Sequence, residues 1–476
     1  MTKQDRLYAR RNFLKSGTAA ALLPWLPGSL FAAGDDEFDY QLTASVSGIR
    51  LADEPFPETK TWSFNRQSPG PLLRLRRGET VRVAVKNELP QELTVHWHGL
   101  RITNAMDGVP ILTQPPITPG DTFVYRYTPP DAGTFWYHSH VNTAEQVGRG
   151  LYGPIIVEEP EAPPVDRDLV WVLDDWKLDQ RAQIVADFDN RRDLARAGRL
   201  GNTVTINGRI PQSLSVRAGE RLRLRLINAA NARIFALRFR GHRTLVIARD
   251  GQPVDPYEPG GPVVIGPAQR FDLIFDMTGE PGQRYSVIDV NYPQSPSRLT
   301  DIEYLQQARL PDKPAGDYPG LPRNNIPQPD LRDPLVQPIV LAGGDLGQLT
   351  HAQLGGQRLE MTRLYLLGKM WAINDIVNTG YSDTPLFAVE RGKTVILEFR
   401  NHSAWPHPMH LHGHHFQVLE HSRDREVTGK WLDTVLLGPE ESARVAFVAD
   451  NPGDWLFHCH ILGHARAGMM AVIRVS

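Results

Sequence analysis

The chain has 476 residues, which is too long for one ordinary domain and suits about three. Its 52 Lys and Arg residues nearly balance 54 Asp and Glu residues, so the net charge of −2 gives no indication of a nucleic acid or an anionic membrane as partner. Hydrophobic residues make up 41%, enough for several cores, and the 40 Gly and 39 Pro favour an all-β protein of many short strands.

The N-terminus has the pattern of an export signal. Arg10 and Arg11 are followed by Phe-Leu-Lys, then by an apolar run over 18–26 and small residues near position 33. The arginine pair resembles the twin-arginine motif, so we expect residues 1–34 to be a twin-arginine signal peptide, with the export machinery as partner and a periplasmic location. The alternative, an anchor helix, is disfavoured because Pro24 and Pro27 break the apolar run. No other stretch is long and apolar enough to span a membrane.

A repeat occurs three times along the chain. In each copy a glycine precedes an asparagine by nine residues, and apolar residues alternate with others in between; the pairs are Gly78 and Asn87, Gly219 and Asn228, and Gly392 and Asn401. Such alternation predicts a half-buried strand that follows a turn. The middle copy contains the run Arg221, Arg223 and Arg225, which we expect on the solvated face of its strand.

Three copies of one unit predict three consecutive Greek-key β-sandwich domains. Their expected bounds are 35–160, 165–305 and 346–476. The stretch 306–345 is rich in proline, including Pro311, Pro314, Pro319, Pro322, Pro327 and Pro329, and is expected to form an extended surface linker.

Four histidine motifs stand at matching places in the first and third copies. They are His96-Trp97-His98, His138-Ser139-His140, His407-Pro408-Met409-His410-Leu411-His412, and His458-Cys459-His460 followed by His464 and Met469. His96 and His410 both lie eighteen residues after the glycine of their repeat, where the middle copy has Leu237. This register predicts a metal site between domains 1 and 3, with domain 2 acting as a spacer.

The ligand types indicate copper. Residues i and i+2 of a strand share a face, so each His-x-His motif can direct two imidazoles to one place. The only cysteine, Cys459, cannot form an intramolecular disulfide, and it must face away from His458 and His460. A thiolate with two histidines and a weak axial methionine is the blue-copper pattern. Zinc accepts imidazoles too, but a closed structural zinc site needs only four ligands.

These motifs together resemble the multicopper oxidase family, which includes laccases, bilirubin oxidases and bacterial copper-tolerance and manganese oxidases. The resemblance covers essentially the whole mature chain and implies three cupredoxin-like domains, four copper ions, dioxygen as acceptor and a small reducing substrate. It assigns His407, Cys459 and His464 to the type 1 copper with Met469 axial, and Cys459 to electron transfer. It assigns His96 and His410 to the type 2 copper, and two triads to the type 3 coppers: His98, His138 and His460, and His140, His412 and His458.

Proton supply is the part of the site where the family pattern is incomplete. Asp107 resembles the family's acid near the type 2 copper and is expected to supply protons or to orient a water. Its alternative interpretation is an ordinary Asp-Gly turn. Several relatives carry an acid between the His-Cys-His motif and the next histidine, whereas residues 461–463 here are Ile-Leu-Gly. His414 and His415 are interpreted as lining the substrate approach or, alternatively, as supporting or surface residues.

Three functions are compatible with these motifs. The first is a laccase-like oxidase of phenols or aromatic amines, and the second is a metal-ion oxidase for Cu(I) or Mn(II). Only 8 methionines occur, with no cluster beyond Met469-Met470, which disfavours a dedicated cuprous oxidase. The third is a non-enzymatic assembly protein of the same fold, which the complete ligand set argues against. A two-domain nitrite reductase would lack the type 3 ligands.

Overall fold

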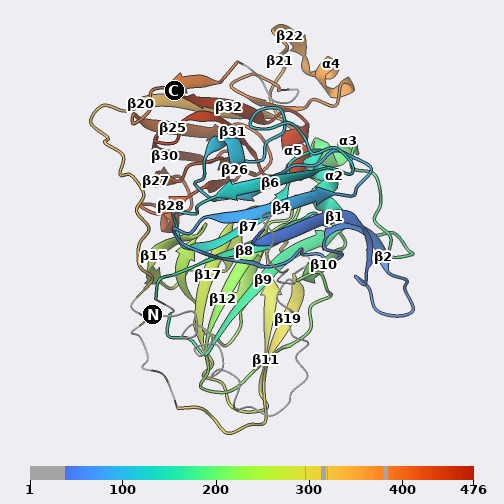
Figure 1. The fold of residues 1–476 in the computed structure, drawn as a ribbon, viewed down its shortest axis with the longest axis vertical. Helices are drawn as coiled ribbons and strands as arrows, with labels where there is room; N and C mark the ends of the chain where they lie inside the picture. The colour runs from blue at the N-terminus through green and yellow to red at the C-terminus, as the bar shows by residue number, and fades with distance from the viewer. Residues whose placement is uncertain are drawn as a thin grey trace. The chain divides into compact units, whose positions relative to one another are not determined.

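A computed structural model describes residues 38–476, apart from 162, 295, 312, 314–317, 319 and 379–383. The expected signal peptide, residues 1–34, lies outside the described residues, as do Pro314 and Pro319 of the expected linker. The described strands form three pairs of sheets and one two-stranded hairpin (Figure 1). The predicted all-β fold of three sandwiches is therefore confirmed.

The first sandwich pairs two four-stranded sheets. One has the order β2-β1-β4-β6, with bounds Thr59–Phe64, Tyr40–Ile49, Val81–Asn87 and Thr122–Tyr127. The other has the order β3-β8-β7-β5, with bounds Leu73–Arg76, Tyr152–Glu158, Gly133–Ser139 and Val95–His98.

The second sandwich has a six-stranded and a five-stranded sheet. The larger is β10-β9-β12-β17-β14-β15, with bounds Thr203–Ile206, Arg167–Trp176, Arg221–Asn228, Arg270–Asp276, Leu245–Arg249 and Gln252–Tyr257. The smaller is β11-β19-β18-β13-β16, with bounds Leu214–Val216, Ser297–Tyr304, Arg284–Asp289, Phe235–Phe239 and Val263–Ile265.

The third sandwich is built in the same way. Its larger sheet is β23-β20-β25-β30-β27-β28, with bounds Trp371–Ile373, Leu335–Gly343, Thr394–Asn401, Ser442–Val448, Phe416–His421 and Trp431–Leu432. Its smaller sheet is β24-β32-β31-β26-β29, with bounds Phe387–Val389, Met470–Val475, Gly453–Cys459, His407–Leu411 and Thr434–Leu437. The hairpin is β21 (His351–Leu354) and β22 (Gln357–Glu360). β20 lies inside the 306–345 stretch and pairs in parallel with β25, so at least this part of the stretch belongs to a sheet.

Helical segments are short and lie between strands. They are η1 (Asn104–Met106), α2 (Thr143–Gly148), α3 (Arg191–Leu194), α4 (Met361–Leu366), η2 (Arg425–Val427) and α5 (Leu462–Arg466). α5 contacts both α2 and α3, so elements of all three sandwiches meet beside it (Figure 1). Among the described residues, no helix has the length and apolar character that a bilayer span requires.

Each of the three copies of the sequence repeat forms the same local structure, which is a turn, a strand and a second turn. The predicted strands are β4, β12 and β25, and the glycines before them have φ values of 77°, 86° and 87°, a region that favours glycine. The asparagine that ends each strand accepts a hydrogen bond from the backbone N–H two residues later, over 2.9 to 3.0 Å, and its amide donates to backbone carbonyls of the following turn; these residues are Asn87, Asn228 and Asn401. Asparagine recurs because this turn needs a donor and an acceptor on one short side chain.

The arginine run of β12 is not solvated, so that prediction is wrong. Arg223 and Arg225 are buried between the first and second sandwiches, where Arg223 Nη2 lies 2.6 Å from Glu159 and 2.5 Å from Asp272. Arg225 Nη1 also donates to Thr134 of β7, over 3.0 Å. Alternation along a strand separates two faces, but it cannot tell water from a neighbouring domain that covers the polar face.

Candidate metal centre

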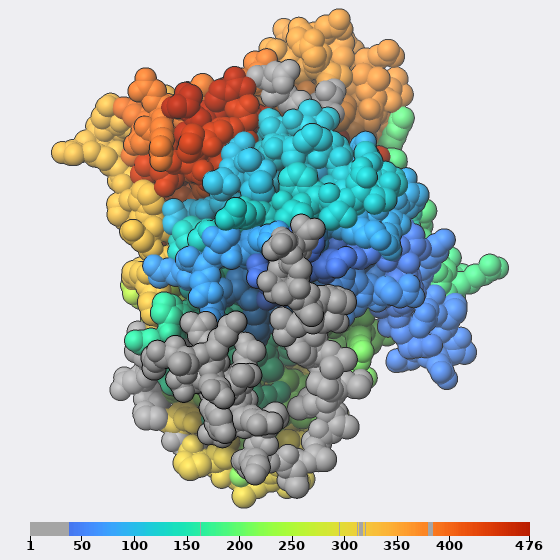
Figure 2. All heavy atoms as spheres, viewed as in Figure 1, coloured from blue at the N-terminus to red at the C-terminus, as the bar shows by residue number. Residues whose placement is uncertain are grey.

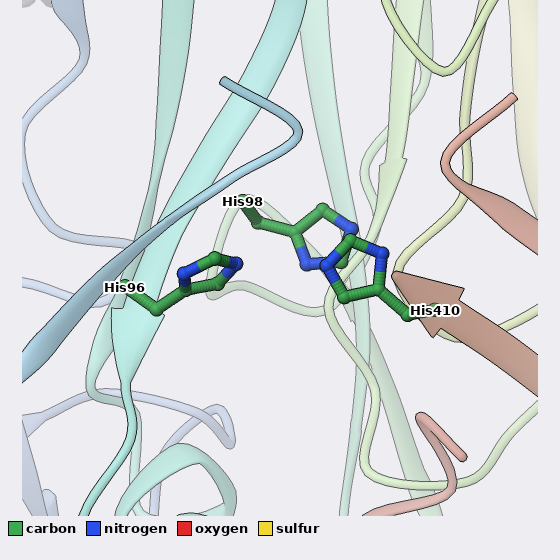
Figure 3. Close-up of side chains that lie close together, drawn as sticks. All are labelled: His96, His98 and His410. Atoms are coloured by element: carbon green, nitrogen blue, oxygen red, sulfur yellow. The ribbon is translucent and has the colours of Figure 1, made fainter. Parts of the chain in front are cut away.

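Histidine and cysteine side chains meet in buried groups whose ligand atoms lie within 4.8 Å of one another. Three groups adjoin, because they share or neighbour the same rings: His96, His98 and His410; His98, His138 and His460; and His140, His412 and His458. The fourth stands apart and consists of His407, Cys459 and His464. Figure 3 shows His96 and His98, from β5, facing His410, from β26. Every histidine expected as a ligand from the sequence lies in one of these groups.

Strand register brings these rings together. His96 of β5 is paired with His138 of β7, and His410 of β26 is paired with His458 of β31, so both sandwiches present the same cross-strand pair. Cross-strand partners point to the same face of a sheet. Cys459 is the next residue on β31 and points to the opposite face, into the core of the third sandwich.

Backbone carbonyls determine which nitrogen of each ring can bind a metal. The Nδ1 atoms of His96, His138, His410 and His458 each lie 2.9 Å from a carbonyl oxygen. A carbonyl only accepts, so these Nδ1 atoms carry the proton and leave a lone pair on Nε2. The Nε2 atoms of His96, His138 and His410 are buried with no hydrogen-bond partner among the described residues. Buried acceptors without partners are costly, so these residues fit a bound cation.

Burial also keeps the rings neutral. Burial lowers the pKa of His458 to about 3, with the neighbouring His410 adding to the effect, and lowers the pKa of His98, His138 and His412 well below its usual value. A neutral imidazole is the form that binds a metal.

The separate group offers two nitrogens and one sulfur. Cys459 Sγ lies 3.5 Å from His407 Nδ1 and 3.7 Å from His464 Nδ1, and the two Nδ1 atoms are 3.1 Å apart. The outer nitrogens are held by Ser403 Oγ at 2.8 Å and by the Arg196 carbonyl at 2.5 Å. Burial raises the pKa of the Cys459 thiol, so a thiolate forms here only when a cation compensates it.

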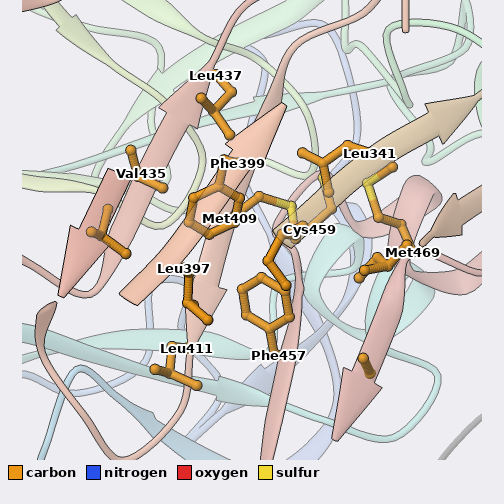
Figure 4. Close-up of a cluster of buried hydrophobic side chains, with 14 of the residues drawn as sticks. Leu341, Leu397, Phe399, Met409, Leu411, Val435, Leu437, Phe457, Cys459 and Met469 are labelled. Carbon is orange, nitrogen blue, oxygen red and sulfur yellow. The ribbon is translucent and has the colours of Figure 1, made fainter. Parts of the chain in front are cut away.

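Met469 lies beside this group. It is buried in the same hydrophobic cluster as Cys459 (Figure 4). Its backbone carbonyl accepts from the Cys459 N–H over 3.1 Å, and its N–H donates to the His464 carbonyl over 3.0 Å. The loop after α5 therefore brings Met469 into contact with both Cys459 and His464.

Models of the multicopper oxidase family match residues 47–162, 167–306 and 357–476 of the chain. The chain belongs to the multicopper oxidase family. It is 32% identical to multicopper oxidase MmcO of Mycobacterium tuberculosis, over 98% of this chain and 96% of that protein. Laccase-1 of Fomitopsis schrenkii is 30% identical over 85% and 81% of the two chains. A multicopper oxidase of Pseudomonas thermotolerans superposes with a TM-score of 0.81 at 34% identity, over 92% and 98%.

Membership has two consequences. The three sandwiches are cupredoxin domains, as the resemblance implied. The protein is a copper-dependent oxidoreductase that uses dioxygen. The histidine clusters described above are the residues that fit its copper.

The three adjoining histidine groups together form what we call the central cluster. Asp107 is buried within this cluster and is more than a turn residue. Its Oδ2 accepts from His412 Nδ1 over 2.9 Å, and its Oδ1 lies 3.2 Å from His96 Nδ1. Its backbone carbonyl accepts from the same His96 nitrogen. Asp107 therefore orients one ring from the first domain and one from the third. Gly108, at φ 83°, allows the tight approach to Val95, where a Cβ would meet the carbonyl oxygen at 1.8 Å.

Asp433 is a second buried acid, and the sequence analysis missed it. Its Oδ1 lies 3.2 Å from His98 Nε2, and its carbonyl accepts from His410 Nδ1. Arg270 compensates its charge with a forked ion pair and holds the pKa of Asp433 well below its usual range against the opposing effect of burial. The signal was available, because Asp433 interrupts the apolar run 431–437, and a buried charge needs a partner.

The second domain is therefore part of the site rather than a spacer. Arg270 begins β17 of the second domain, and Asp250 lies in the turn between β14 and β15 of the same domain. Asp250 Oδ2 accepts a hydrogen bond from the Thr434 N–H over 3.2 Å. Burial, together with nearby Asp433, raises the pKa of Asp250 to about 6. His415 Nε2 lies 3.4 Å from Asp433 Oδ2, so His415 supports this cluster and is not at the surface.

A cavity of about 270 Å³ opens onto the outer rings of the central cluster. Its lining includes the ligand histidines His140 and His458, together with Asn142, Lys369 and Arg466. None of the described lining residues is a carboxylate, which agrees with the missing acid at 461–463.

Proposed function

We propose that this protein is a laccase-like oxidase that takes single electrons from a phenol or an aromatic amine and reduces dioxygen by four electrons and four protons to two waters. The observation that supports this most directly is the convergence of the histidines into adjoining groups, with lone pairs directed inward by backbone carbonyls. A closed structural site would need far fewer ligands.

The proposed ligand assignment places four copper ions. His407, Cys459 and His464 would hold the type 1 ion with Met469 as axial ligand, and His96 and His410 would hold the type 2 ion. The two type 3 ions would be held by His98, His138 and His460, and by His140, His412 and His458. Copper in these groups supplies one-electron redox steps and a place for dioxygen.

The chain's own residues connect the two sites. Peptide bonds on either side of Cys459 join it to His458 and His460, so an electron from the sulfur reaches the central cluster along covalent bonds. Asp107 is placed to move protons, since it is buried and hydrogen-bonded to His412. The Ser403 hydroxyl and the Arg196 carbonyl hold the rings of His407 and His464 in position for the type 1 ion.

The experiment compares oxygen uptake by one copper-loaded preparation with 2,6-dimethoxyphenol, Cu(I) and Mn(II). We expect a blue protein that turns over the phenol. Cys459→Ser should lose the blue absorption and the uptake, whereas Met409→Leu, which changes the residue opposite Cys459 on β26, should keep both. A colourless wild type with full copper occupancy contradicts the oxidase assignment.

The alternative function is a metal-ion oxidase, and the same experiment distinguishes it from a phenol oxidase. Turnover of Cu(I) or Mn(II) without turnover of the phenol would replace the proposal. Absence of oxygen uptake with the phenol, with Cu(I) and with Mn(II) would favour the non-enzymatic assembly protein. The twin-arginine motif further supports export to the periplasm, where these substrates would be met.

A further inference from the structure

A short segment of the second domain covers the type 1 group. This segment, residues 191–196, comprises α3 and the two residues after it, and we name it the strap. Three consecutive carbonyls of the strap accept hydrogen bonds from the third domain: Leu194 from Trp371 Nε1 over 2.7 Å, Ala195 from the Asp345 N–H over 2.7 Å, and Arg196 from His464 Nε2 over 2.5 Å. α3 also contacts α5, which carries His464 (Figure 1).

The strap covers the Nε2 edge of the His464 imidazole and separates it from solvent. Leu194 and Ala195 are buried in the hydrophobic cluster that also contains Cys459. The Trp371 ring packs against the His464 ring, with 4.1 Å between the ring centroids. His464 itself is fully buried. A reducing substrate therefore meets the outer face of the strap and not the imidazole.

The outer face combines positive charge with apolar surface. Arg191 and Arg192 are exposed, and the Arg191 guanidinium lies 5.8 Å from the Tyr365 ring and donates to the Leu366 carbonyl over 3.1 Å. The Leu366 side chain is 60% exposed. Tyr365 and Leu366 belong to α4, whose orange atoms lie at the surface with those of β21 and β22 in Figure 2.

The charge of this face is not neutralised by its neighbours. Arg196 is paired with Asp345 at 2.6 Å, and Asp193 is paired with Lys177 at 2.9 Å. For Arg191 and Arg192, in contrast, the part of the chain that the structure describes offers no ion pair. The face thus carries two uncompensated cations beside an exposed aromatic and an exposed aliphatic side chain.

We propose that the reducing substrate is an aromatic anion, a phenol that bears a carboxylate or a sulfonate, and that it docks on the outer face of the strap. Its anionic group lies on Arg191 and Arg192, and its ring packs against Tyr365 and Leu366. The phenol loses one electron and its hydroxyl proton, which passes to solvent, and becomes a phenoxyl radical. The electron crosses the Arg196 peptide and its hydrogen bond to His464. This proposal rests on the proposed function, since it names the substrate class of that type 1 site.

Binding is tested with a probe that has no phenolic hydrogen. Titration calorimetry of the copper-loaded protein compares 4-methoxybenzoate with neutral 4-methoxybenzamide. We expect the anion to bind more tightly, and the double variant Arg191→Gln, Arg192→Gln to lose about fivefold in affinity for the anion alone, since exposed ion pairs contribute roughly 1 kcal/mol. Added salt should reduce the difference. Arg77→Gln, at an exposed turn of the first domain, is the matched control and should leave binding unchanged.

Two further readouts separate docking from other effects. For 4-hydroxy-3,5-dimethoxybenzoate the double variant should raise KM about fivefold at unchanged kcat, while KM for 2,6-dimethoxyphenol stays the same. Bound 4-methoxybenzoate should leave the blue absorption unchanged, because the strap lies between it and His464. Equal binding of anion and amide, an unaffected double variant, or a shifted blue band would overturn the proposal. If no phenol is oxidised the proposed function fails, but the calorimetry still decides whether the strap binds aromatic anions.

Discussion

Arg270 donates hydrogen bonds of 2.9 and 2.6 Å to the two carboxylate oxygens of Asp433, although one residue belongs to the second domain and the other to the third. Both side chains are fully buried. Asp433 in turn contacts His98 of the first domain and His410 of the third. One ion pair thus joins three domains at the central histidine cluster, so the middle domain supports the cluster although it contributes none of the expected ligands.

Arg270→Met should destabilise the protein and loosen the central cluster together. The change leaves the Asp433 carboxylate buried without its cation, which costs about 3–5 kcal/mol in the free energy of unfolding. We expect copper to be lost from the central groups while the blue absorption is retained, as measured by metal analysis and optical spectra. Arg223→Met is the matched control, because Arg223 also forms a buried ion pair, but its partner Asp272, unlike Asp433, has no hydrogen bond to a ligand histidine among the described residues. If both variants lose copper equally, the effect is general instability.

Asp107→Asn should slow the reaction with dioxygen and spare the reaction with the reductant. Asparagine retains an acceptor for His412 and suits the Asp-Gly turn, but it cannot carry a proton. Reoxidation of the fully reduced protein, followed by stopped flow, should slow by about 100-fold or more. Anaerobic bleaching of the blue band should keep its rate. Asp121→Asn, another exchange beside a glycine but exposed, should behave as wild type. Unchanged reoxidation in Asp107→Asn would mean that Asp107 only positions the rings and the turn and does not supply protons.

Met469→Leu should raise the reduction potential of the type 1 site. An axial thioether is a weak ligand that tunes this potential, and leucine offers no donor. Redox titration of the blue band measures the potential directly. Met409→Leu changes a second buried methionine of the same cluster and should not shift it. If only Met409→Leu shifted the reduction potential, the axial role would belong to Met409 and not to Met469.

The copper-free protein should lose stability in acid. The folded-state pKa values of His458 and His464 are lowered to about 3 from 6.5, so between these pH values the unfolded chain binds protons that the folded protein excludes. Stability therefore falls as the pH drops through this window, by about 1.4 kcal/mol per pH unit for each histidine. Chemical denaturation at several pH values measures the slope. The double variant His458→Gln, His464→Gln should show a shallower one, and an equal slope would contradict the expected role of these rings.

Export should depend on the arginine pair near the N-terminus. Replacing Arg10 and Arg11 with lysine preserves the charge, but it should leave the protein in the cytoplasm if the twin-arginine machinery carries it. Cell fractionation with immunodetection measures the distribution. Arg6→Lys, outside the pair, should export normally, and normal export of the double variant would assign another route.

The sequence by itself determined the repeat, the all-β fold and the set of histidines that meet in the buried candidate metal groups. These follow from local rules: alternation places residues on one face of a strand, and equal offsets from Gly78 and Gly392 place His96 and His410 at equivalent positions. Even the orientation of Cys459, on the face opposite to His458 and His460, follows from its position between these two histidines.

Only the tertiary structure decided what surrounds these ligands. Arg270 lies 163 positions before Asp433, and Arg196 lies 268 before His464, so no local pattern connects them. Alternation also misled for Arg223, because a polar face looks the same in the sequence whether water or another domain covers it. Strand periodicity reports the faces of one element, whereas the burial of a charge and the covering of a copper site depend on which distant elements pack against it.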